Sequence, residues 1–434
     1  MIKKAFKMCS DLTIFDYIRV KIDRLSCKLP FFIKKRQQRK LKKILKYANR
    51  HCNYYKNLNI NSKEIYNLER YPFLTKKIII DNFDDIMSDN RSKMIKYVSH
   101  TGGSTGEPLE LCQGPGHDDI FQIKLWKRKG YKNGDIILAL DGAKVDSEAI
   151  KNRKYLYIKS KTQLPYGGYG LSSLYITDDN IGEYCNFIKE LKPQFIRGYP
   201  SFVYRISNYI IKNKIEMNLN LKGIELTSES SYQYQYDVIR KAFNCDIFLQ
   251  YGHTEACVFG YTFDDSMRYY CEPLYGIVEV INEKGKHVKK GETGEVVVTT
   301  LHNYLMPLIR YKTGDYAEYG GVDDGKVVLN KVLGRTQDYI YDRNNNKVLL
   351  TALIFAQHFD ALGKIERWQI EQYKSGMVTL RIKKNKDYKK SSEMEIKQLF
   401  DKVGNVDVEF DYKSKFVLTP RGKSMLLIQH IKDV

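Results

Sequence analysis

The segment Ser99-His-Thr-Gly-Gly-Ser-Thr-Gly-Glu-Pro108 combines glycines with hydroxyl-bearing side chains, the residue types that suit a phosphate-binding loop. It follows an alternating stretch, 94–98, that predicts a short strand. A glycine-rich loop leaving a strand can turn several backbone N–H groups toward one anion, and serine and threonine hydroxyls add donors. Glu107 and Pro108 stand where a Walker loop has lysine and serine or threonine, so the loop is not of that class. Taken alone, the segment is equally consistent with a surface turn.

Four further stretches place functional side chains after predicted strands or in turns. Tyr251-Gly-His-Thr-Glu255 offers an aromatic face, a hydroxyl and a carboxylate. Tyr311-Lys-Thr-Gly-Asp315 places an aspartate in a tight turn, where it can accept hydrogen bonds from two ribose hydroxyls. Gly334-Arg-Thr-Gln-Asp338 contributes a cation, and Pro420-Arg-Gly-Lys423 contributes a lysine near the C-terminus. Each stretch alone is also consistent with a β-turn, a helix cap, a surface salt bridge or a basic tail.

The elements that must position these stretches alternate between strand and helix from residue 117 to residue 250. The pattern predicts helices at 117–129 and 180–191 and strands at 135–140, 173–177, 194–197, 223–227 and 246–250. Such alternation indicates a parallel α/β sheet, in which ligands bind beyond the carboxyl ends of the strands. We therefore expect four loops at that edge, namely 99–108, 198–201, 228–230 and 251–255.

The pattern changes after residue 270. Strand-like runs at 276–282, 295–301 and 327–333, separated by glycine-containing turns, predict an antiparallel β-rich section. Gly334-Arg335 marks a boundary, after which about 100 residues predict a small α+β domain. The predicted fold class is therefore α/β, with a large N-terminal domain, residues 1–333, that contains a parallel α/β sheet and a β-rich subdomain. Residues 334–434 form the predicted C-terminal domain.

Composition narrows the class of protein. A chain of 434 residues exceeds what one hydrophobic core supports. Uncharged runs such as 348–358 are too short to cross a bilayer, and the N-terminus lacks the apolar core of a signal peptide, so we expect a cytoplasmic protein. The eight cysteines contain no C-x-x-C pair and are expected to be reduced thiols. A zinc site at His253, Cys257 and Cys271 is the less favoured alternative.

The net charge of +21 is concentrated in part on one predicted helix, residues 34–48. Its apolar residues recur at helical spacing, which predicts an amphipathic helix with a basic outer face. Three interpretations compete: a solvated face, peripheral contact with an anionic membrane, and contact with nucleic acid. No nucleic-acid-binding motif accompanies the helix, so no nucleic-acid partner is expected. We favour the solvated face and keep membrane contact as the alternative.

In this order, the glycine loop and the four stretches resemble the successive motifs of the adenylate-forming (AMP-binding) superfamily. Members of this superfamily join carboxylates to a thiol through an acyl-adenylate. The resemblance runs from about residue 40 to the end. Three segments are similar to the phenylacetate–coenzyme A ligase branch, which includes relatives in capsular polysaccharide biosynthesis: Leu41-Lys-Lys-Ile-Leu-Lys-Tyr-Ala48, Tyr54-Tyr55 and Arg197-Gly-Tyr-Pro-Ser201.

The resemblance implies how ATP and Mg²⁺ are bound. Thr254 would contact the α-phosphate, Glu255 would bind Mg²⁺, and Tyr251, followed by Gly252, would stack on adenine. Asp315 and Arg335 would hold the ribose. The β- and γ-phosphates would be held by the glycine loop, through Thr101, Gly102, Gly103, Ser104, Thr105 and Gly106.

Lys423 would bridge the α-phosphate and the substrate carboxylate. These roles agree with the chemistry, because attack of a carboxylate on the α-phosphorus builds negative charge that donors, a cation and Mg²⁺ must stabilise. In the family the small C-terminal domain is a mobile lid that rotates between half-reactions about the segment matching 334–338. Here Gln337 replaces a charged pivot residue, Lys312 replaces an arginine, and Cys271 replaces a histidine.

The implied activity is ATP-dependent activation of a carboxylic acid, followed by transfer to a thiol, with ATP, Mg²⁺ and coenzyme A as the small molecules. The alternative is an adenylating enzyme of polysaccharide biosynthesis that passes the acyl group to a sugar or an amine. A binding module without catalysis is disfavoured because the implied catalytic set is intact. The identity of the acid is not determined, since the candidate pocket walls suit an aryl acid as well as a polar one. These candidate wall residues are Tyr166, Tyr169, Tyr199, Ser228 and His253.

Overall fold

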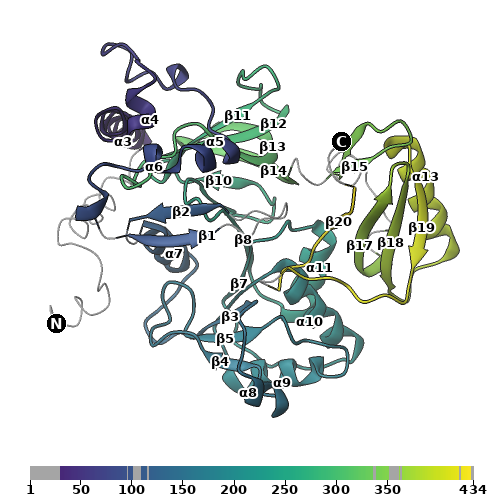
Figure 1. The fold of residues 1–434 in the computed structure, drawn as a ribbon. Helices are drawn as coiled ribbons and strands as arrows, with labels where there is room; N and C mark the ends of the chain where they lie inside the picture. The colour runs from purple at the N-terminus through teal and green to yellow at the C-terminus, as the bar shows by residue number, and fades with distance from the viewer. Residues whose placement is uncertain are drawn as a thin grey trace. The chain divides into compact units, whose positions relative to one another are not determined.

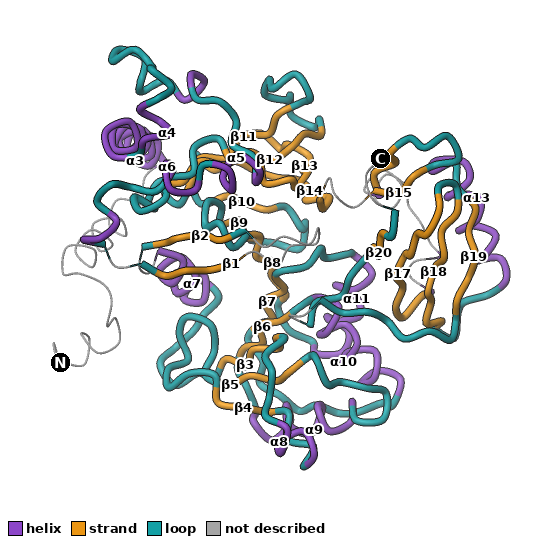
Figure 2. The backbone as a smooth tube through the Cα atoms, viewed as in Figure 1, coloured by secondary structure: helices purple, strands orange, loops and turns teal. Residues whose placement is uncertain are grey.

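The structure is a computed structural model of the 434-residue chain. It describes residues 30–94, 96–100, 109–114, 117–335, 339–350, 361, 364–419 and 422–431. The described residues form a mixed α/β fold with a large mixed sheet and a small C-terminal mixed sheet (Figure 1; Figure 2). Through these residues the chain divides into two compact units, Met1–Tyr131 with Leu249–Val332 and Lys132–Phe248 with Leu333–Val434. The division into domains 1–333 and 334–434 that the sequence indicates remains a prediction.

The helical part of the first unit begins with the long basic helix α3, Pro30–His51. Its apolar face is buried through Ile44, Leu45 and Ala48, which confirms the predicted amphipathic helix. Thr75 caps α5, because its hydroxyl accepts a hydrogen bond from the N–H of Ile78 at 3.2 Å. The other helices here are α4 Asn53–Lys56, η2 Leu68–Arg70, α5 Lys76–Asp81, α6 Phe83–Ile86, η3 Arg91–Lys93 and α7 His117–Arg128.

The strands of the first unit confirm the predicted β-rich section. A separate pair, β1 Tyr97–His100 and β2 Glu110–Gln113, is antiparallel. The larger set follows the spatial order β8-β9-β10-β14-β13-β12-β11. Neighbours within it are antiparallel for β8–β9, β9–β10, β10–β14, β12–β13 and β11–β12. Their bounds are β8 Ile247–Gly252, β9 Phe259–Tyr261, β10 Tyr269–Cys271, β11 Gly276–Ile281, β12 Thr293–Thr300, β13 Tyr311–Asp323 and β14 Lys326–Arg335.

The second unit contains the predicted parallel strands. Strand β3 is parallel to both β5 and β6, and β6 is parallel to β7. The edge strand β4 is antiparallel, which makes the sheet mixed. The bounds are β3 Ile137–Asp141, β4 Leu156–Ile158, β5 Tyr169–Ser172, β6 Phe195–Gly198 and β7 Gly223–Thr227, and the helices are α8 Ser147–Lys151, α9 Ile181–Leu191, α10 Pro200–Lys212 and α11 Gln233–Phe243.

The strand predicted at 173–177 is wrong, and β5 lies four residues earlier. In the structure this segment forms a polar turn around Asn180. The Asn180 side chain accepts a hydrogen bond from the N–H of Thr177 at 2.7 Å and donates one to the carbonyl of Tyr175 at 2.9 Å. Local side-chain bonds of this kind compete with a sheet ladder.

The C-terminal part of the second unit has its own mixed sheet, ordered β19-β18-β17-β20. Its core includes Trp368, Ile370, Leu380 and Phe400, all buried. The elements are β15 Tyr339–Tyr341, β16 Lys347–Leu349, β17 Ile365–Lys374, β18 Met377–Lys384, α13 Lys390–Gly404, β19 Asp407–Asp411 and β20 Leu427–Gln429. Among the helices that the structure describes, none is long and apolar enough to cross a membrane.

Candidate functional site

Two of the predicted motifs meet in the first unit through a reciprocal pair of hydrogen bonds. The hydroxyl of Tyr251 donates to Asp315 Oδ2 at 2.8 Å, and the hydroxyl of Tyr311 donates to Glu255 Oε1 at 2.9 Å. Each motif therefore supplies a tyrosine to the carboxylate of the other. Tyr251 belongs to β8 and Tyr311 to β13, so the two bonds connect strands that β9, β10 and β14 separate in the sheet.

Glu255 is buried and lies 3.2 Å from His253, measured from Oε2 to Nδ1. Burial by itself would raise the pKa of Glu255, but the electrostatic attraction of His253 and the hydrogen bond from Tyr311 outweigh it. Together they lower the pKa of Glu255 from 4.5 to about 2. The carboxylate is thus ionised at neutral pH, the state that a magnesium ligand requires.

The backbone around Glu255 is held by neighbouring segments of the first unit. The side chain of Gln113, on β2, donates to the carbonyl of Thr254. A Cβ on Gly252 would lie 2.7 Å from Gln250 Nε2 and 3.3 Å from the carbonyl of Val258, so a side chain at this position would require Gln250 to move. The thiol of Cys257 donates to the carbonyl of Glu255 at 3.2 Å.

The described residues contain no group of three or more histidine, cysteine or acidic side chains arranged to hold a metal ion. Cys271, one member of the alternative zinc set, is buried, and burial raises its pKa to about 12.

The other predicted nucleotide-binding residues are outside the structural description. The glycine loop, Thr101, Gly102, Gly103, Ser104, Thr105 and Gly106, lies outside the described residues. Arg335 ends β14, and its side chain also lies outside them. Their roles stay predictions.

Lys423 lies in the second unit, in a tight turn between two bridged residues, Leu418 and Ser424. The N–H of Lys423 donates to Thr419 Oγ1 at 3.1 Å, and the N–H of Thr419 donates to the Lys423 carbonyl at 2.9 Å. The ammonium Nζ lies 5.7 Å from the ring centre of Tyr199, in cation–π range.

Glu229 anchors this turn. Its Oε1 accepts a hydrogen bond from the N–H of Ser424 at 2.6 Å, and its Oε2 accepts one from the N–H of Ser201, in the first turn of α10, at 3.0 Å. Burial raises the pKa of Glu229, and the opposing effects of these bonds and of Lys423 do not cancel it. Glu229 was not among the residues predicted from the sequence, although it belongs to the predicted loop 228–230.

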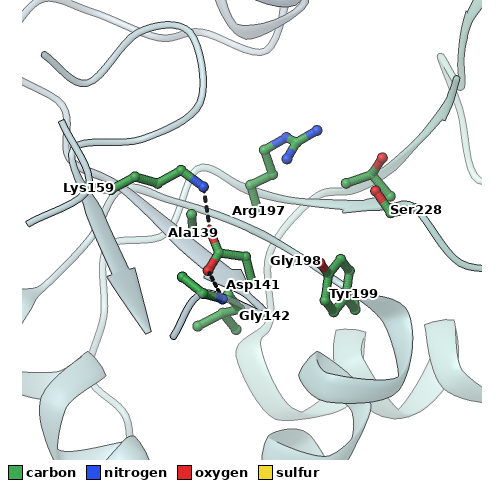
Figure 3. A pocket seen from close by; sticks show the side chains of 11 residues that line it. Ala139, Asp141, Gly142, Lys159, Arg197, Gly198, Tyr199 and Ser228 are labelled. Carbon is green, nitrogen blue, oxygen red and sulfur yellow. Dashed lines mark hydrogen bonds and ion pairs between the residues drawn. The ribbon is translucent and has the colours of Figure 1, made fainter. Parts of the chain in front are cut away.

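A cavity of about 290 Å³ opens at the carboxyl ends of β3, β6 and β7 (Figure 3). Tyr199 and Ser228 line it, and their role in a substrate pocket stays a prediction. Burial and the nearby charge of Asp141 raise the pKa of Tyr199 to about 12, so its hydroxyl is protonated. The cavity is lined by Ala139, Leu140, Asp141, Gly142, Ala143, Lys159, Arg197, Gly198, Tyr199, Thr227 and Ser228.

Three charged residues of the lining were not predicted. Asp141 accepts hydrogen bonds from Lys159 and from the hydroxyl of Tyr157. Arg197 donates through Nε to Glu225 at 3.0 Å, and Glu225 is fully buried. Asp141 directly follows the strand predicted at 135–140, at the ligand-binding edge, a signal that could have identified it from the sequence.

The remaining predicted pocket residues have other positions. The guanidinium carbon of Arg197 lies 5.3 Å from the ring centre of Tyr166. Tyr166 therefore contacts a lining residue and contributes only indirectly to the cavity wall. Tyr169 begins β5 and is not a lining residue of this cavity. His253 is paired with Glu255 in the first unit.

No family model matches the chain. Protein CapK of Staphylococcus aureus is 25% identical over 421 residues, which cover 91% of this chain and 89% of that protein.

Among solved structures, the fold is similar to that of 2-hydroxyisobutyryl-CoA ligase in the postadenylation state with R3-HIB-AMP. The TM-score is 0.68 at 16% identity, over 91% of this chain and 89% of the ligase. The same ligase with 2-HIB-AMP and CoA, in the thioesterification state, gives a TM-score of 0.55 at 17% identity, over 91% and 89% of the two chains. These likenesses show that the fold extends over nine-tenths of the chain.

Proposed function

We propose that this chain is an adenylate-forming enzyme that activates a carboxylic acid to an acyl-adenylate and transfers the acyl group to the thiol of coenzyme A. The observation that carries the proposal is the reciprocal bonding of the motifs around Glu255 and Asp315. Two separate motifs, each expected to bind part of one ATP molecule, supply side chains to each other. A β-turn or a surface salt bridge, the ordinary interpretations of either motif, would not require this pairing.

Glu255 suits the metal role that the superfamily implies. Its carboxylate is ionised, held in place by Tyr311, and has oxygen lone pairs left for a hard cation, so it would hold Mg²⁺. When bound, Mg²⁺ would offset the negative charge of the phosphates. Thr254, the preceding residue, would donate its hydroxyl to the α-phosphate.

Asp315 would orient the ATP ribose by accepting hydrogen bonds from its hydroxyls, with Arg335 beside it. The ring of Tyr251, whose hydroxyl is bonded to Asp315, would pack against adenine. The glycine loop 101–106 would hold the β- and γ-phosphates, which leave as pyrophosphate. Binding both ends of ATP fixes the α-phosphorus for attack by the acid.

Lys423 would bring the reacting groups together. Its ammonium would contact both the α-phosphate and the substrate carboxylate and stabilise the charge that builds on the phosphate during attack. A lysine is a compact charge on a flexible stem, which suits a residue that must leave before the thiol approaches. We propose that residues 334–434 act as the lid that carries Lys423, with 334–338 as its pivot.

ATP–pyrophosphate exchange across a panel of acids tests the proposal. Lys423→Ala should abolish exchange yet still convert a supplied acyl-adenylate to product, while Lys413→Ala, an exposed lysine of the same C-terminal region, should exchange normally. Near-normal exchange by Lys423→Ala would overturn its assignment. Absence of exchange with every acid, alongside ATP binding, would favour a binding module.

The acyl acceptor is tested separately, in the presence of coenzyme A. Formation of a thioester that depends on coenzyme A supports the proposal. Exchange without thioester formation would favour the alternative, an adenylating enzyme of polysaccharide biosynthesis that passes the acyl group to a sugar or an amine.

A further inference from the structure

We infer that the acid activated by this chain is small and polar, and that its body carries a second hydrogen-bond-accepting oxygen group. A hydroxyl, a carbonyl or a second carboxylate would meet this description, whereas an aryl or alkyl acid would not. The inference rests on the proposed function and specifies its substrate class. The observation behind it is the charged lining of the 290 Å³ cavity.

The position of Lys423 points to this cavity as the place for the body of the acid. Its ammonium lies 5.7 Å from the ring centre of Tyr199, a lining residue. The preceding residue, Gly422, also approaches the cavity wall, since a Cβ there would lie 3.0 Å from Gly142 Cα. An acid whose carboxylate contacts Lys423 would therefore extend its other end between β3, β6 and β7.

The cavity offers hydrogen-bond donors in excess. Arg197 uses Nε to bond the buried carboxylate of Glu225, and within the described residues its two Nη groups have no hydrogen bond. Lys159 bonds Asp141 through its Nζ, which carries three protons. Ser228 adds a hydroxyl (Figure 3). Because an arginine fork and an ammonium only donate, the complementary ligand must supply acceptor oxygens.

An apolar acid would be rejected for a physical reason. Entering the cavity, it would displace the water that solvates Arg197 and Lys159 and offer these groups no partner in return. Sites built around buried polar groups discriminate strongly against analogues that lack the matching group. Since the charges of Arg197 and Lys159 already have counterions in Glu225 and Asp141, a neutral oxygen group is sufficient, and a second negative charge is not required.

The cavity volume limits the acid further. About 290 Å³ lies at the lower end of the range for small-molecule sites. We therefore expect an acid with a short chain, and long acyl chains to be excluded.

Matched acid pairs in ATP–pyrophosphate exchange test the inference. We would compare 3-hydroxybutyrate and succinate with butyrate, and add phenylacetate as the aryl acid. We expect kcat/KM for at least one polar acid to exceed that for butyrate and phenylacetate by about tenfold or more. Exchange that is equal or better with butyrate or phenylacetate would overturn the inference and leave the proposed function intact. Absence of exchange with all acids would instead contradict the proposed function itself.

Two variants test which residues make the enzyme prefer polar acids over apolar acids. Arg197→Lys keeps a cation for Glu225 but loses the paired Nη donors. The KM for the preferred polar acid should therefore rise, and the ratio of kcat/KM for the polar acid to kcat/KM for the apolar acid should fall by about tenfold. Ser228→Ala, which disturbs no ion pair, should lower the ratio in the same direction. Arg205→Lys, on α10 and bonded to Asp178, is the matched control and should keep the wild-type ratio. An equal loss for polar and apolar acids in both test variants would show a structural role and overturn the assignment.

Discussion

At the scale of single residues, the site depends on tyrosines that orient carboxylates. Glu255 and Asp315 were predicted from their motifs, but their hydrogen-bond donors, Tyr311 and Tyr251, were not predicted in that role. Burial raises the pKa of Tyr251 well above its ordinary value, and Asp315 reinforces the shift. Tyr251 therefore stays protonated and remains a donor at any working pH.

Tyr311→Phe should weaken the apparent affinity of the enzyme for magnesium. The variant removes the hydroxyl bonded to Glu255 Oε1, so the carboxylate loses one of the contacts that fix its orientation. Loss of one such bond corresponds to about 1 kcal/mol. We expect the Mg²⁺ concentration for half-maximal exchange to rise about fivefold, measured by titration at saturating ATP and acid.

The control for that experiment is Tyr319→Phe, the same chemical change further along β13, where Tyr319 packs edge-on against His287. It should leave the magnesium titration unchanged. An unchanged titration in Tyr311→Phe as well would show that this hydroxyl does not position Glu255.

At the scale of elements, Glu229 connects the Lys423 turn to the first turn of α10. It accepts N–H bonds from Ser424 and Ser201 on opposite oxygens. Backbone N–H groups at the start of a helix lack intrahelical partners, so a carboxylate there is favourably placed. Glu229 is therefore suited to position Lys423 without touching the reacting atoms.

Glu229→Gln should affect the two half-reactions unequally. A glutamine side chain presents only one acceptor oxygen, so one of the two N–H bonds is lost and the Lys423 turn is less well held. Exchange should slow by about tenfold, the equivalent of about 1.4 kcal/mol, while conversion of supplied acyl-adenylate is retained. Asp178→Asn, which loosens an exposed contact between Asp178 and Lys383, is the control and should leave both rates unchanged. Equal slowing of both half-reactions by Glu229→Gln would argue against a positioning role.

Glu229 also predicts a dependence of stability on pH. The pKa of Glu229 in the folded state is raised above 4.5, so the carboxyl group loses its proton at a lower pH in the unfolded chain than in the folded chain. The folded state then binds more protons, and the free energy of unfolding falls as pH rises. Relative to Glu229→Gln, the wild-type protein should lose stability as pH rises from about 4.5 through the raised pKa, as measured by urea unfolding. A difference that grows in favour of the wild type over this range would contradict the assignment.

At the scale of the whole molecule, the net charge of +21 is partly explained by α3. Ile44, Leu45 and Ala48 face the core, while Lys34, Lys35, Lys42, Lys43 and Lys46 are exposed. Exposed charges of this kind support solubility without defining a binding site.

We therefore expect no binding of the protein to vesicles of anionic lipid at 0.15 M salt, where the Debye length is about 8 Å. Replacement of these five exposed lysines by glutamine should leave exchange unchanged, because α3 contains none of the proposed site residues. Cosedimentation with vesicles is the measurement. Binding that persists at this salt concentration, and that the glutamine variant loses, would establish the membrane-contact alternative instead.

The sequence by itself determined the order of the motifs, the parallel strands between residues 137 and 227, the antiparallel section after 270 and the buried face of α3. These features follow from local periodicity and turn residues, which a chain displays before it folds. The local pattern failed at 173–177, where the bonds of Asn180 favoured a turn.

Only the tertiary structure decided which side chains meet. The bond from Ser424 to Glu229 joins residues 195 positions apart, and that from Tyr251 to Asp315 joins residues 64 apart. The charged cavity likewise combines Asp141, Arg197 and Ser228 from three separate strand ends. No local pattern encodes such contacts, because they depend on how strands are ordered in the sheet and on how the C-terminal turn packs against α10.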